Sequence, residues 1–539
     1  QALDLYRGLP DSEQQQANTL FNVGLVLGDT DREEEALTAC RQALDLYRGL
    51  PDSEQQQASC LHDIGVALRA MGNDEEAVAA YRQAADLYRC LSGNERDQAD
   101  CLYHVADILD TTGRQEEAAS DYRRALDLYR GLPDSEHNQA RCLRNIGVAL
   151  YAAGRYEDAM TAYREEVDLY RGLPDSEQQQ ASCLYNIAIT LGDMGRHEEA
   201  VAAYRRALDL YRGLPDTEYD QADCLNDIAN ILRKTEQHEE AVAAYRQALD
   251  LYRGLPDSEQ QQANCLYNIG VALGAAERYD EAAAAYQQAL SLYRGLPDSE
   301  QDQASTLFNA GVTLDEAERY DQALASYRQA LDLYRGPPDS EQQQAGCLYN
   351  TGNVLHKTER HEEALASYQD ALAIFRKADG TQYQQAICLN NTATTLERMG
   401  RYEEALTAYH SALKLDRSLP DNEQQQAECL FNIGNSLYAM ERHEEALASY
   451  QDALTLFRQV GDTPHQAICL INIANALYAA GRHEESLASL RKALGVYRQA
   501  DGTEQDQVDC LSLIGDLLNH MGRHEEAQDA YQQAQDHHR

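Results

Sequence analysis

Eleven of the thirteen cysteines recur at a fixed interval of 41 residues, with one interval of 40. This column contains Cys60, Cys101, Cys142, Cys183, Cys224, Cys265, Cys347, Cys388, Cys429, Cys469 and Cys510, and Thr19 and Thr306 complete it. Residues one structural layer apart exceed the Cα separation of about 7 Å that a disulfide allows, and no Cys-x-x-Cys pair indicates zinc. We interpret the column as small buried side chains, whose free thiols favour a reducing, cytoplasmic compartment.

Histidine followed by two glutamates forms a second column that could bind a metal or transfer protons. Its members are His197, His238, His361, His443, His483 and His524. No second histidine lies at ligand spacing within a repeat, and the column recurs with the scaffold, so packing between helices is the better interpretation. The sequence also has no nucleophile elbow, no phosphate-binding glycine loop and no paired-carboxylate signature. We therefore expect no catalytic residue, no metal and no cofactor, and hence no enzyme.

Asparagine forms the third column, and its amides are the residues most suited to binding. Its members are Asn22, Asn145, Asn186, Asn268, Asn309, Asn350, Asn391, Asn432 and Asn472, with Asp63, Asp227 and His104 as replacements. An amide offers a donor and an acceptor together. A row of them can therefore bind the backbone of an extended peptide whatever side chains the peptide carries.

Two neighbouring columns refine this hypothesis. The residue before the asparagine is often aromatic and suits the floor of a groove, as at Phe21, Tyr103, Tyr185, Tyr267, Phe308, Tyr349 and Phe431. The third residue after it is apolar at Leu25, Val66, Val148, Ile189, Val271 and Val312, and polar at Asn353, Thr394, Asn435 and Asn475. Residues at i and i+3 share a helical face. We therefore expect an amide-rich peptide site at roughly 345–480.

The elements that position these columns are short repeats. The string QALDLYRGLPDSEQQQA at Gln1–Ala17 returns unchanged at Gln42–Ala58 and Gln247–Ala263. An alanine column with the same interval as the cysteines gives about thirteen repeats. Each repeat predicts two amphipathic helices, as in Leu266, Ile269, Gly270 and Leu273, and then Ala282, Tyr286, Ala289, Leu290 and Leu292.

Turn signals separate these helices. Between repeats, Gly254 can take the left-handed conformation that ends a helix, and Pro256 prevents its continuation. Asp257 or Ser258 then caps the next helix, with Gln261 completing a capping box. Within a repeat, the turn lies around Glu277–Tyr279 and holds glycine elsewhere, as at Gly195 or Gly400.

The pattern Leu266-x2-Ile269-Gly270-x2-Leu273 followed by Ala282-x3-Tyr286-x2-Ala289 resembles the tetratricopeptide repeat. Leu266 stands at the usual Trp position, and Tyr252-Arg253 replaces the closing Pro. The repeat is about seven residues longer than the standard 34, which resembles the repeats of kinesin light chains and bacterial adaptors. The resemblance implies an all-α fold, a right-handed superhelical solenoid of antiparallel helix pairs. We expect one continuous domain over 1–539, with 1–10 as the remnant of a truncated repeat and 510–539 as a C-terminal cap.

In this family the first helix of each repeat lines the concave surface, and the asparagine ladder resembles that of O-linked N-acetylglucosamine transferase. The resemblance thus assigns peptide binding to a set of amides and aromatic rings. These residues are Asn145, Asn186, Asn268, Asn309, Asn350, Asn353, Asn391, Asn432, Asn435, Asn472, Asn475, Tyr185, Tyr267, Phe308, Tyr349 and Phe431. The alternative is that Asn is merely common at this position of the repeat. A clamp for acidic chain ends is not expected, because only Arg141 and Arg144 provide positive charge.

The formal net charge of −44 bears on the partners. Such a chain repels nucleic-acid phosphates and anionic membranes, and no stretch reaches the roughly 18 apolar residues of a membrane span. A protein or extended peptide is the expected partner, with basic ones favoured, unless the acidic surface serves only solvation.

The leading prediction is a non-catalytic scaffold that binds proteins or peptides. One alternative is the sensor or partner-binding half of a larger bacterial signalling protein, with an ATPase or protease-like domain upstream. The other is self-association through an uncapped N-terminal end.

Overall fold

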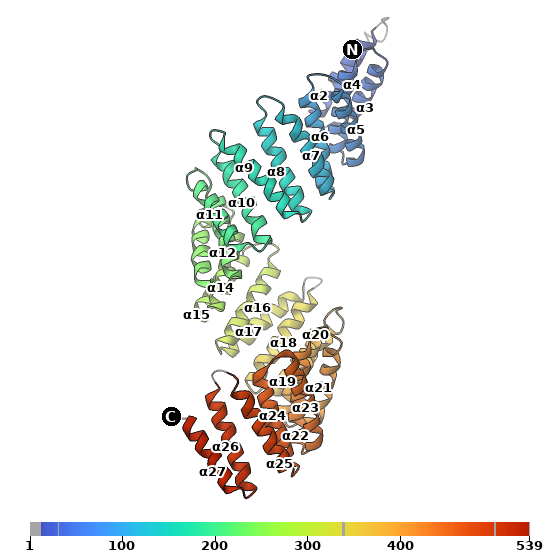
Figure 1. Cartoon of the computed structure of the whole chain (residues 1–539). Helices are drawn as coiled ribbons and strands as arrows, with labels where there is room; N and C mark the ends of the chain where they lie inside the picture. The colour runs from blue at the N-terminus through green and yellow to red at the C-terminus, as the bar shows by residue number, and fades with distance from the viewer. Residues whose placement is uncertain (1–11, 31, 337–339, 501–502, 538–539) are drawn as a thin grey trace. The chain divides into compact units, whose positions relative to one another are not determined.

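The computed structural model describes residues 12–30, 32–336, 340–500 and 503–537. These residues form thirteen helix pairs and no strand (Figure 1). The first helices of the pairs are α2 (Glu13–Gly28), α4 (Glu54–Ala70), α6 (Glu95–Thr111), α8 (Glu136–Ala152), α10 (Glu177–Asp193), α12 (Glu218–Lys234), α14 (Glu259–Ala275), α16 (Glu300–Glu316), α18 (Glu341–Lys357), α20 (Gln382–Arg398), α22 (Glu423–Ala439), α24 (Thr463–Ala479) and α26 (Glu504–His520).

The second helices follow their partners after short turns. They are α3 (Glu33–Arg48), α5 (Asp74–Arg89), α7 (Gln115–Arg130), α9 (Tyr156–Arg171), α11 (His197–Tyr211), α13 (His238–Tyr252), α15 (Tyr279–Tyr293), α17 (Tyr320–Tyr334), α19 (His361–Phe375), α21 (Tyr402–Asp416), α23 (His443–Val460), α25 (His483–Tyr497) and α27 (His524–His537). The pairs are numbered here as repeats 1 to 13, so that α22 and α23 form repeat 11. The all-α solenoid expected from the repeat pattern is confirmed.

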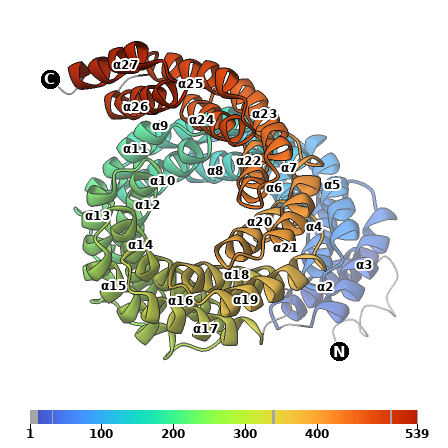
Figure 2. The same ribbon diagram turned by 90° about the horizontal axis from the view of Figure 1, so that it is seen from below.

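The chain divides into two compact halves, Gln1–Gln261 and Gln262–Arg539. In the N-terminal half each helix from α2 to α13 packs on the next, and in the C-terminal half each helix from α15 to α27 does so. First helices also contact the first helices of adjacent repeats, as α18 does with α16 and α20. Figure 2 shows α8, α10 and α12 on the inner side of one half and α16, α18 and α20 on the inner side of the other. The single domain over 1–539 stays a prediction, and the expected remnant at 1–10 lies outside the described residues.

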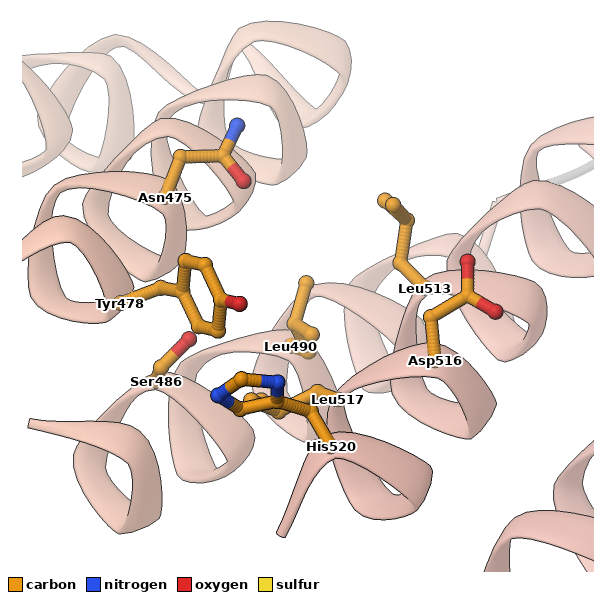
Figure 3. Close-up of a pocket in the computed structure, with 8 residues that line it drawn as sticks. All are labelled: Asn475, Tyr478, Ser486, Leu490, Leu513, Asp516, Leu517 and His520. Carbon is orange, nitrogen blue, oxygen red and sulfur yellow. The ribbon is translucent and has the colours of Figure 1, made fainter. Parts of the chain in front are cut away.

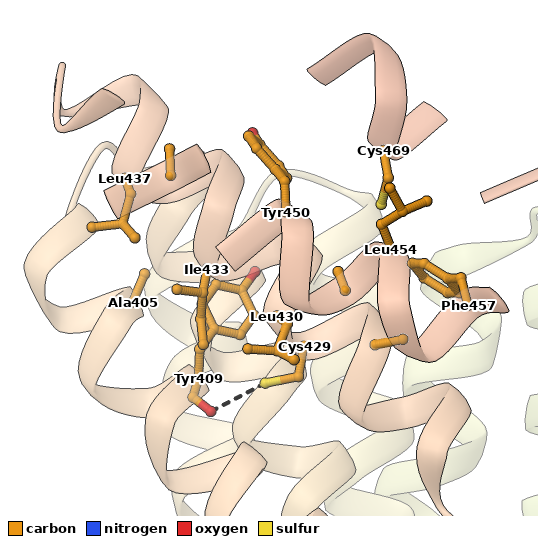
Figure 4. Close-up of a cluster of buried hydrophobic side chains, with 14 of the residues drawn as sticks. Ala405, Tyr409, Cys429, Leu430, Ile433, Leu437, Tyr450, Leu454, Phe457 and Cys469 are labelled. Atoms are coloured by element: carbon orange, nitrogen blue, oxygen red, sulfur yellow. Dashed lines mark hydrogen bonds between the residues drawn. The ribbon is translucent and has the colours of Figure 1, made fainter. Parts of the chain in front are cut away.

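The core of each half is built from the columns that recur in every repeat. In repeats 10 to 12, Tyr409, Tyr450 and Phe457 are buried together with leucine and alanine side chains (Figure 4). The cysteine column is buried, as expected, and the Sγ atom of Cys429 donates to the carbonyl oxygen of Tyr409 at 3.1 Å. Burial raises the pKa of the Cys429 thiol to about 12, so this thiol is protonated and unreactive at neutral pH.

Small residues of the first helices make room for tyrosine rings. A Cβ atom added to Gly434 would lie 2.5 Å from the ring of Tyr450, and one added to Gly270 would lie 2.7 Å from the ring of Tyr286. The glycine therefore allows the second helix to place an aromatic ring directly against the backbone of the first. The tyrosine is thus the side chain that this small residue accommodates.

The turn between repeats differs from the prediction in two ways. Gly254 has no positive φ, and the left-handed residue is Asp257, with φ of 52°, because aspartate tolerates this conformation. At the equivalent junction Ser53 makes no side-chain capping bond to its own helix. Its hydroxyl donates instead to the carbonyl oxygen of Leu50 at 2.9 Å, as Ser258 does to Tyr252 and Leu255. The expected capping box is therefore wrong, because the hydroxyl satisfies carbonyls at the end of the preceding helix.

The turn within a repeat follows the prediction. Glu277 and Gly195 occupy the same position in different repeats, and their φ angles are 59° and 73°. Glycine adopts this conformation without strain, whereas a glutamate does so at a cost. No described helix is long and apolar enough to span a membrane.

Candidate peptide-binding surface

The predicted asparagines all lie on first helices, the helices of the inner side in Figure 2. Asn475 is exposed, whereas the other ten predicted asparagines are half-buried between neighbouring helices. A half-buried amide must compete with nearby protein groups for its hydrogen bonds. The partners of each amide therefore decide whether it is available to a ligand.

Tyrosine hydroxyls occupy several of these amides. Within a first helix, a tyrosine precedes the asparagine column and reaches the column residue of the next repeat. The Nδ2 atoms of Asn145, Asn309 and Asn391 donate to the hydroxyls of Tyr103, Tyr267 and Tyr349 at 2.8, 2.7 and 2.9 Å. In the same arrangement the Tyr185 hydroxyl donates to Asp227 Oδ2 at 2.7 Å. These tyrosine–column bonds tie adjacent repeats together, so these amides are only partly free.

Other asparagines of the column lie on the first helices between those whose column residue is bonded to a tyrosine. The side chains of Asn186, Asn268 and Asn432 make no hydrogen bond to any residue that the structure describes, and Asn350 only accepts a 3.4 Å bond from Asn353. Asn186, Asn268, Asn350 and Asn432 follow one another at intervals of two repeats. The predicted ladder thus has free amides on every second first helix, namely α10, α14, α18 and α22.

The asparagines at the third position after the column bind the protein itself. The Oδ1 atom of Asn353 accepts from the Tyr368 hydroxyl at 2.8 Å and from Asn391 Nδ2 at 3.0 Å. Asn435 Oδ1 accepts in the same way from Tyr450 at 2.8 Å and from Asn472 at 3.3 Å. These pairs therefore do not present two free amides to a ligand. Asn475 is the exception, since its side chain bonds to no described residue.

The predicted aromatic residues pack against tyrosines of the second helices. Ring centroids lie 5.3 Å apart for Tyr185 and Tyr204, 5.8 Å for Phe308 and Tyr327, and 5.7 Å for Phe431 and Tyr450. Tyr267 and Tyr349 make equivalent contacts with Tyr286 and Tyr368. These half-buried rings support the inner side through contacts with second-helix tyrosines.

In the N-terminal half, charged groups surround the same column. Arg144 precedes Asn145, and its Nε atom lies 2.9 Å from Oε1 of Glu166, which is fully buried. Burial raises the pKa of Glu166, and the Arg144 charge opposes that rise. Arg69 pairs with Asp107, and Arg141 lies over the Tyr103 ring at 4.1 Å. The ion pair of Arg144 and Glu166 was not predicted, although Glu166 interrupts a column that holds alanine at Ala207 and Ala248.

The histidine column behaves as packing. The Nδ1 atoms of His197, His238, His361, His443 and His483 are buried without a hydrogen-bond partner in the described structure. His443 and His483 contact the rings of Tyr438 and Tyr478. No group of three His, Cys, Asp or Glu residues in the described ranges could hold a metal ion.

Comparisons with known proteins agree with the repeat geometry. A tetratricopeptide repeat model matches eight overlapping segments, at residues 15–90, 58–131, 98–172, 179–254, 261–336, 344–418, 425–499 and 466–539. A second tetratricopeptide repeat model matches residues 308–379. No curated protein matches the sequence.

Two solved structures are similar to parts of the chain. The crystal structure of BtubC (BKLC) from P. vanneervenii has a TM-score of 0.37 and 19% identity, over 42% of this chain and 92% of that chain. The apo form of RapI has a TM-score of 0.38 and 14% identity, over 51% of this chain and 97% of that chain.

Proposed function

Because the chain belongs to the tetratricopeptide repeat family, whose members are typically non-catalytic protein-interaction scaffolds, we propose that it binds an extended peptide along the inner side of its C-terminal half. The peptide lies across the first helices, and its backbone bonds to asparagine amides. One observation carries the proposal: within this half, Asn268 and Asn432 bond to no described residue, and Asn350 makes only one long bond.

The alternating arrangement supports this proposal in physical terms. Asn309 and Asn391, on the intervening helices, are held by tyrosine hydroxyls, so their positions are fixed while their neighbours keep free donors and acceptors. A fixed scaffold reduces the entropy lost on binding. Sequence-independent contacts to a peptide backbone would come from the free amides, and selectivity would come from side chains around them.

The test compares two sets of asparagines in the same column. A peptide is selected from a random displayed library on the immobilised chain, and its affinity is measured by fluorescence anisotropy. The triple variant Asn268→Ala, Asn350→Ala, Asn432→Ala removes the free amides, and we expect affinity to fall about 100-fold, at about 1 kcal/mol for each lost hydrogen bond. The control variant Asn309→Ala, Asn391→Ala removes amides that are tied to tyrosines, and a much smaller loss is expected.

Equal affinity of the wild type and the triple variant would contradict the proposal, provided that circular dichroism shows both to be folded. The net charge of −44 further favours basic peptides, and their affinity should fall as salt is added.

The two alternatives, a sensor half of a larger bacterial signalling protein and a self-associating array, stay predictions. We also propose a reducing, cytoplasmic location, because the structure gives every cysteine as a free thiol.

A further inference from the structure

Repeat 12 lacks a tyrosine that nearly all other repeats carry on the second helix. The column contains Tyr81, Tyr122, Tyr163, Tyr204, Tyr245, Tyr286, Tyr327, Tyr368, Tyr409, Tyr450 and Tyr531. Cys40 replaces it in repeat 1, and Leu490 replaces it in repeat 12. The neighbouring repeats show what this tyrosine does.

In repeat 11 the tyrosine fills the space between three helices. Tyr450 is buried against Gly434 of α22, and its hydroxyl donates to Asn435 Oδ1 at 2.8 Å. Asn472 of α24 donates to the same oxygen at 3.3 Å. The asparagine oxygen is thus satisfied from its own repeat and from the next one.

Repeat 12 lacks both of these donors. Asn475 is the counterpart of Asn435, Leu490 stands in place of the tyrosine, and Leu513 stands in place of the next asparagine of the column. Asn475 is exposed, and its side chain makes no bond to any residue in the described ranges. Two leucines have therefore removed two hydrogen-bond donors and an aromatic ring from one place.

A pocket of about 190 Å³ lies at this place. Figure 3 shows Asn475 and Tyr478 of α24 on one side, Leu513 of α26 on the other, and Leu490 of α25 between them. Leu517 and His520 complete the lining, and the rings of His520 and Tyr478 meet edge to face at 5.4 Å. Two further polar groups of the wall already have partners: Asp516 Oδ1 accepts from Tyr531 at 2.6 Å, and Ser486 donates to the Ala474 carbonyl at 2.7 Å.

The pocket suits a phenol ring. An apolar cavity of about 150 Å³ accepts benzene, so the volume is sufficient for one aromatic ring. Leucine side chains and the Tyr478 and His520 rings provide apolar and edge-to-face contacts. Asn475 Oδ1 provides an acceptor for a hydroxyl, which is the role that Asn435 Oδ1 plays for Tyr450.

We propose that this pocket binds the tyrosine side chain of a partner polypeptide, which takes the place of the missing internal tyrosine. The inference rests on the proposed function, because the tyrosine belongs to a peptide bound along the same half of the chain. It adds the chemical identity of one anchor residue of the peptide. That residue is tyrosine in preference to phenylalanine, because Asn475 can accept a hydrogen bond from the tyrosine hydroxyl.

The first experiment uses p-cresol, the side chain of tyrosine, titrated into the full chain and followed by saturation-transfer NMR, with toluene as the matched probe without a hydroxyl. We expect p-cresol to bind about fivefold more tightly than toluene, which corresponds to one neutral hydrogen bond. Leu490→Tyr restores the residue of the other repeats and fills the pocket, so p-cresol affinity should fall at least about tenfold. Asn475→Leu should remove the preference over toluene, whereas Asn435→Leu, at the position already bonded to Tyr450, should keep it.

Three outcomes would overturn the proposal: no binding of p-cresol, equal binding of p-cresol and toluene, or unchanged binding in a folded Leu490→Tyr variant. If Leu490→Tyr fails to fold, Leu513→Asn is the second variant, because the introduced amide donates to Asn475 and occupies its oxygen. It should also weaken p-cresol binding, and unchanged binding would overturn the proposal as well.

A second step tests whether a polypeptide reaches the pocket. A glycine–serine peptide with one central tyrosine should displace p-cresol, and the same peptide with phenylalanine should do so about fivefold less well. Failure of the tyrosine peptide would overturn the proposal. The triple variant of Asn268, Asn350 and Asn432 should still bind p-cresol, so a failure of the amide ladder can be distinguished from a failure of the tyrosine pocket.

Discussion

Around the asparagine column, carboxylates take part in bonds between first helices of the N-terminal half, whereas amide–amide bonds join first helices of the C-terminal half. Arg69 of α4 pairs with Asp107 of α6, and Tyr185 of α10 bonds to Asp227 of α12. In the C-terminal half the corresponding bonds are those of Asn391 to Asn353 and of Asn472 to Asn435. Charges that are paired internally stabilise the array and leave little for a ligand, whereas an amide that gives one bond to the protein keeps others to offer. The comparison is consistent with the proposal that the peptide binds to the C-terminal half.

Breaking the ion pair between the half-buried Arg144 and the buried Glu166 should have the largest effect. Tyr185 occupies the position of Arg144 in the next repeat, so Arg144→Tyr introduces a residue that this position tolerates. The variant leaves the Glu166 carboxylate buried without its partner, and we expect a loss of about 3–5 kcal/mol in stability. The double variant Arg144→Tyr, Glu166→Ala should return to within about 1 kcal/mol of the wild type. Hydrogen exchange of α8 and α9 measures both. A single variant as stable as the wild type would show that Glu166 does not depend on Arg144.

The same pair predicts a pH dependence. Burial raises the folded-state pKa of Glu166 above its usual 4.5. The contribution that the protonated Glu166 makes to the free energy of unfolding is therefore fully present below pH 4.5. It is lost as the pH rises through the raised folded-state pKa. In Arg144→Tyr the lost stability should thus recover partly on acidification, and hydrogen exchange of α8 and α9 at a series of pH values follows it. The Glu166→Ala variant, which has no carboxyl at this site, should show no such recovery.

Removing tyrosine hydroxyls should have an intermediate effect on stability and tests the difference between the two halves. Tyr185→Phe removes a bond to a carboxylate, and about 1.5–3 kcal/mol should be lost. Tyr349→Phe removes a bond to an amide in the C-terminal half, and about 1 kcal/mol should be lost. Phenylalanine is native at this position as Phe308, so the ring itself is tolerated. Urea denaturation compares the two variants, and equal losses would contradict the contrast between the two halves.

The smallest effect concerns the turns within repeats. The left-handed position holds glycine in some repeats, as at Gly195, and glutamate in others, as at Glu277. Glu277→Gly should stabilise the chain by about 0.5–1 kcal/mol, because glycine adopts a positive φ without steric strain. Gly195→Glu is the reciprocal control and should destabilise the chain. A thermal unfolding midpoint that moves in the opposite direction for either variant would show that the glutamate makes a compensating contact.

The fold could be predicted because its signals recur in every repeat. The helices follow from apolar side chains at helical spacing. The buried cysteine column and the turn around Glu277–Tyr279 follow from the return of the same residue types in each repeat. The turn between repeats was less predictable, because the Ser258 hydroxyl had two possible directions. It bonds to Tyr252 and Leu255 of the preceding segment, a choice that depends on the angle between consecutive helices.

The candidate site could be predicted only in part. The column of asparagines was visible, but the separation of free from bonded amides depends on contacts between residues of adjacent repeats, such as Tyr349 and Asn391. Two departures from the pattern were visible in the sequence and were missed. Glu166 interrupts an alanine column and Leu490 interrupts a tyrosine column, and each marks a place where the repeats cease to be equivalent.

The alternation of bonded and free amides has an evolutionary consequence. In the later repeats the string EQQQA begins at Glu177, Glu259, Glu341 and Glu423, and so appears in every second repeat. The tyrosine–column bonds follow the same interval. In this part of the array the sequence and the bonds therefore recur in pairs of repeats. Duplication or loss of such a pair would lengthen or shorten the row of free amides without altering its spacing, whereas loss of a single repeat would disrupt the alternation of free and bonded amides at the junction.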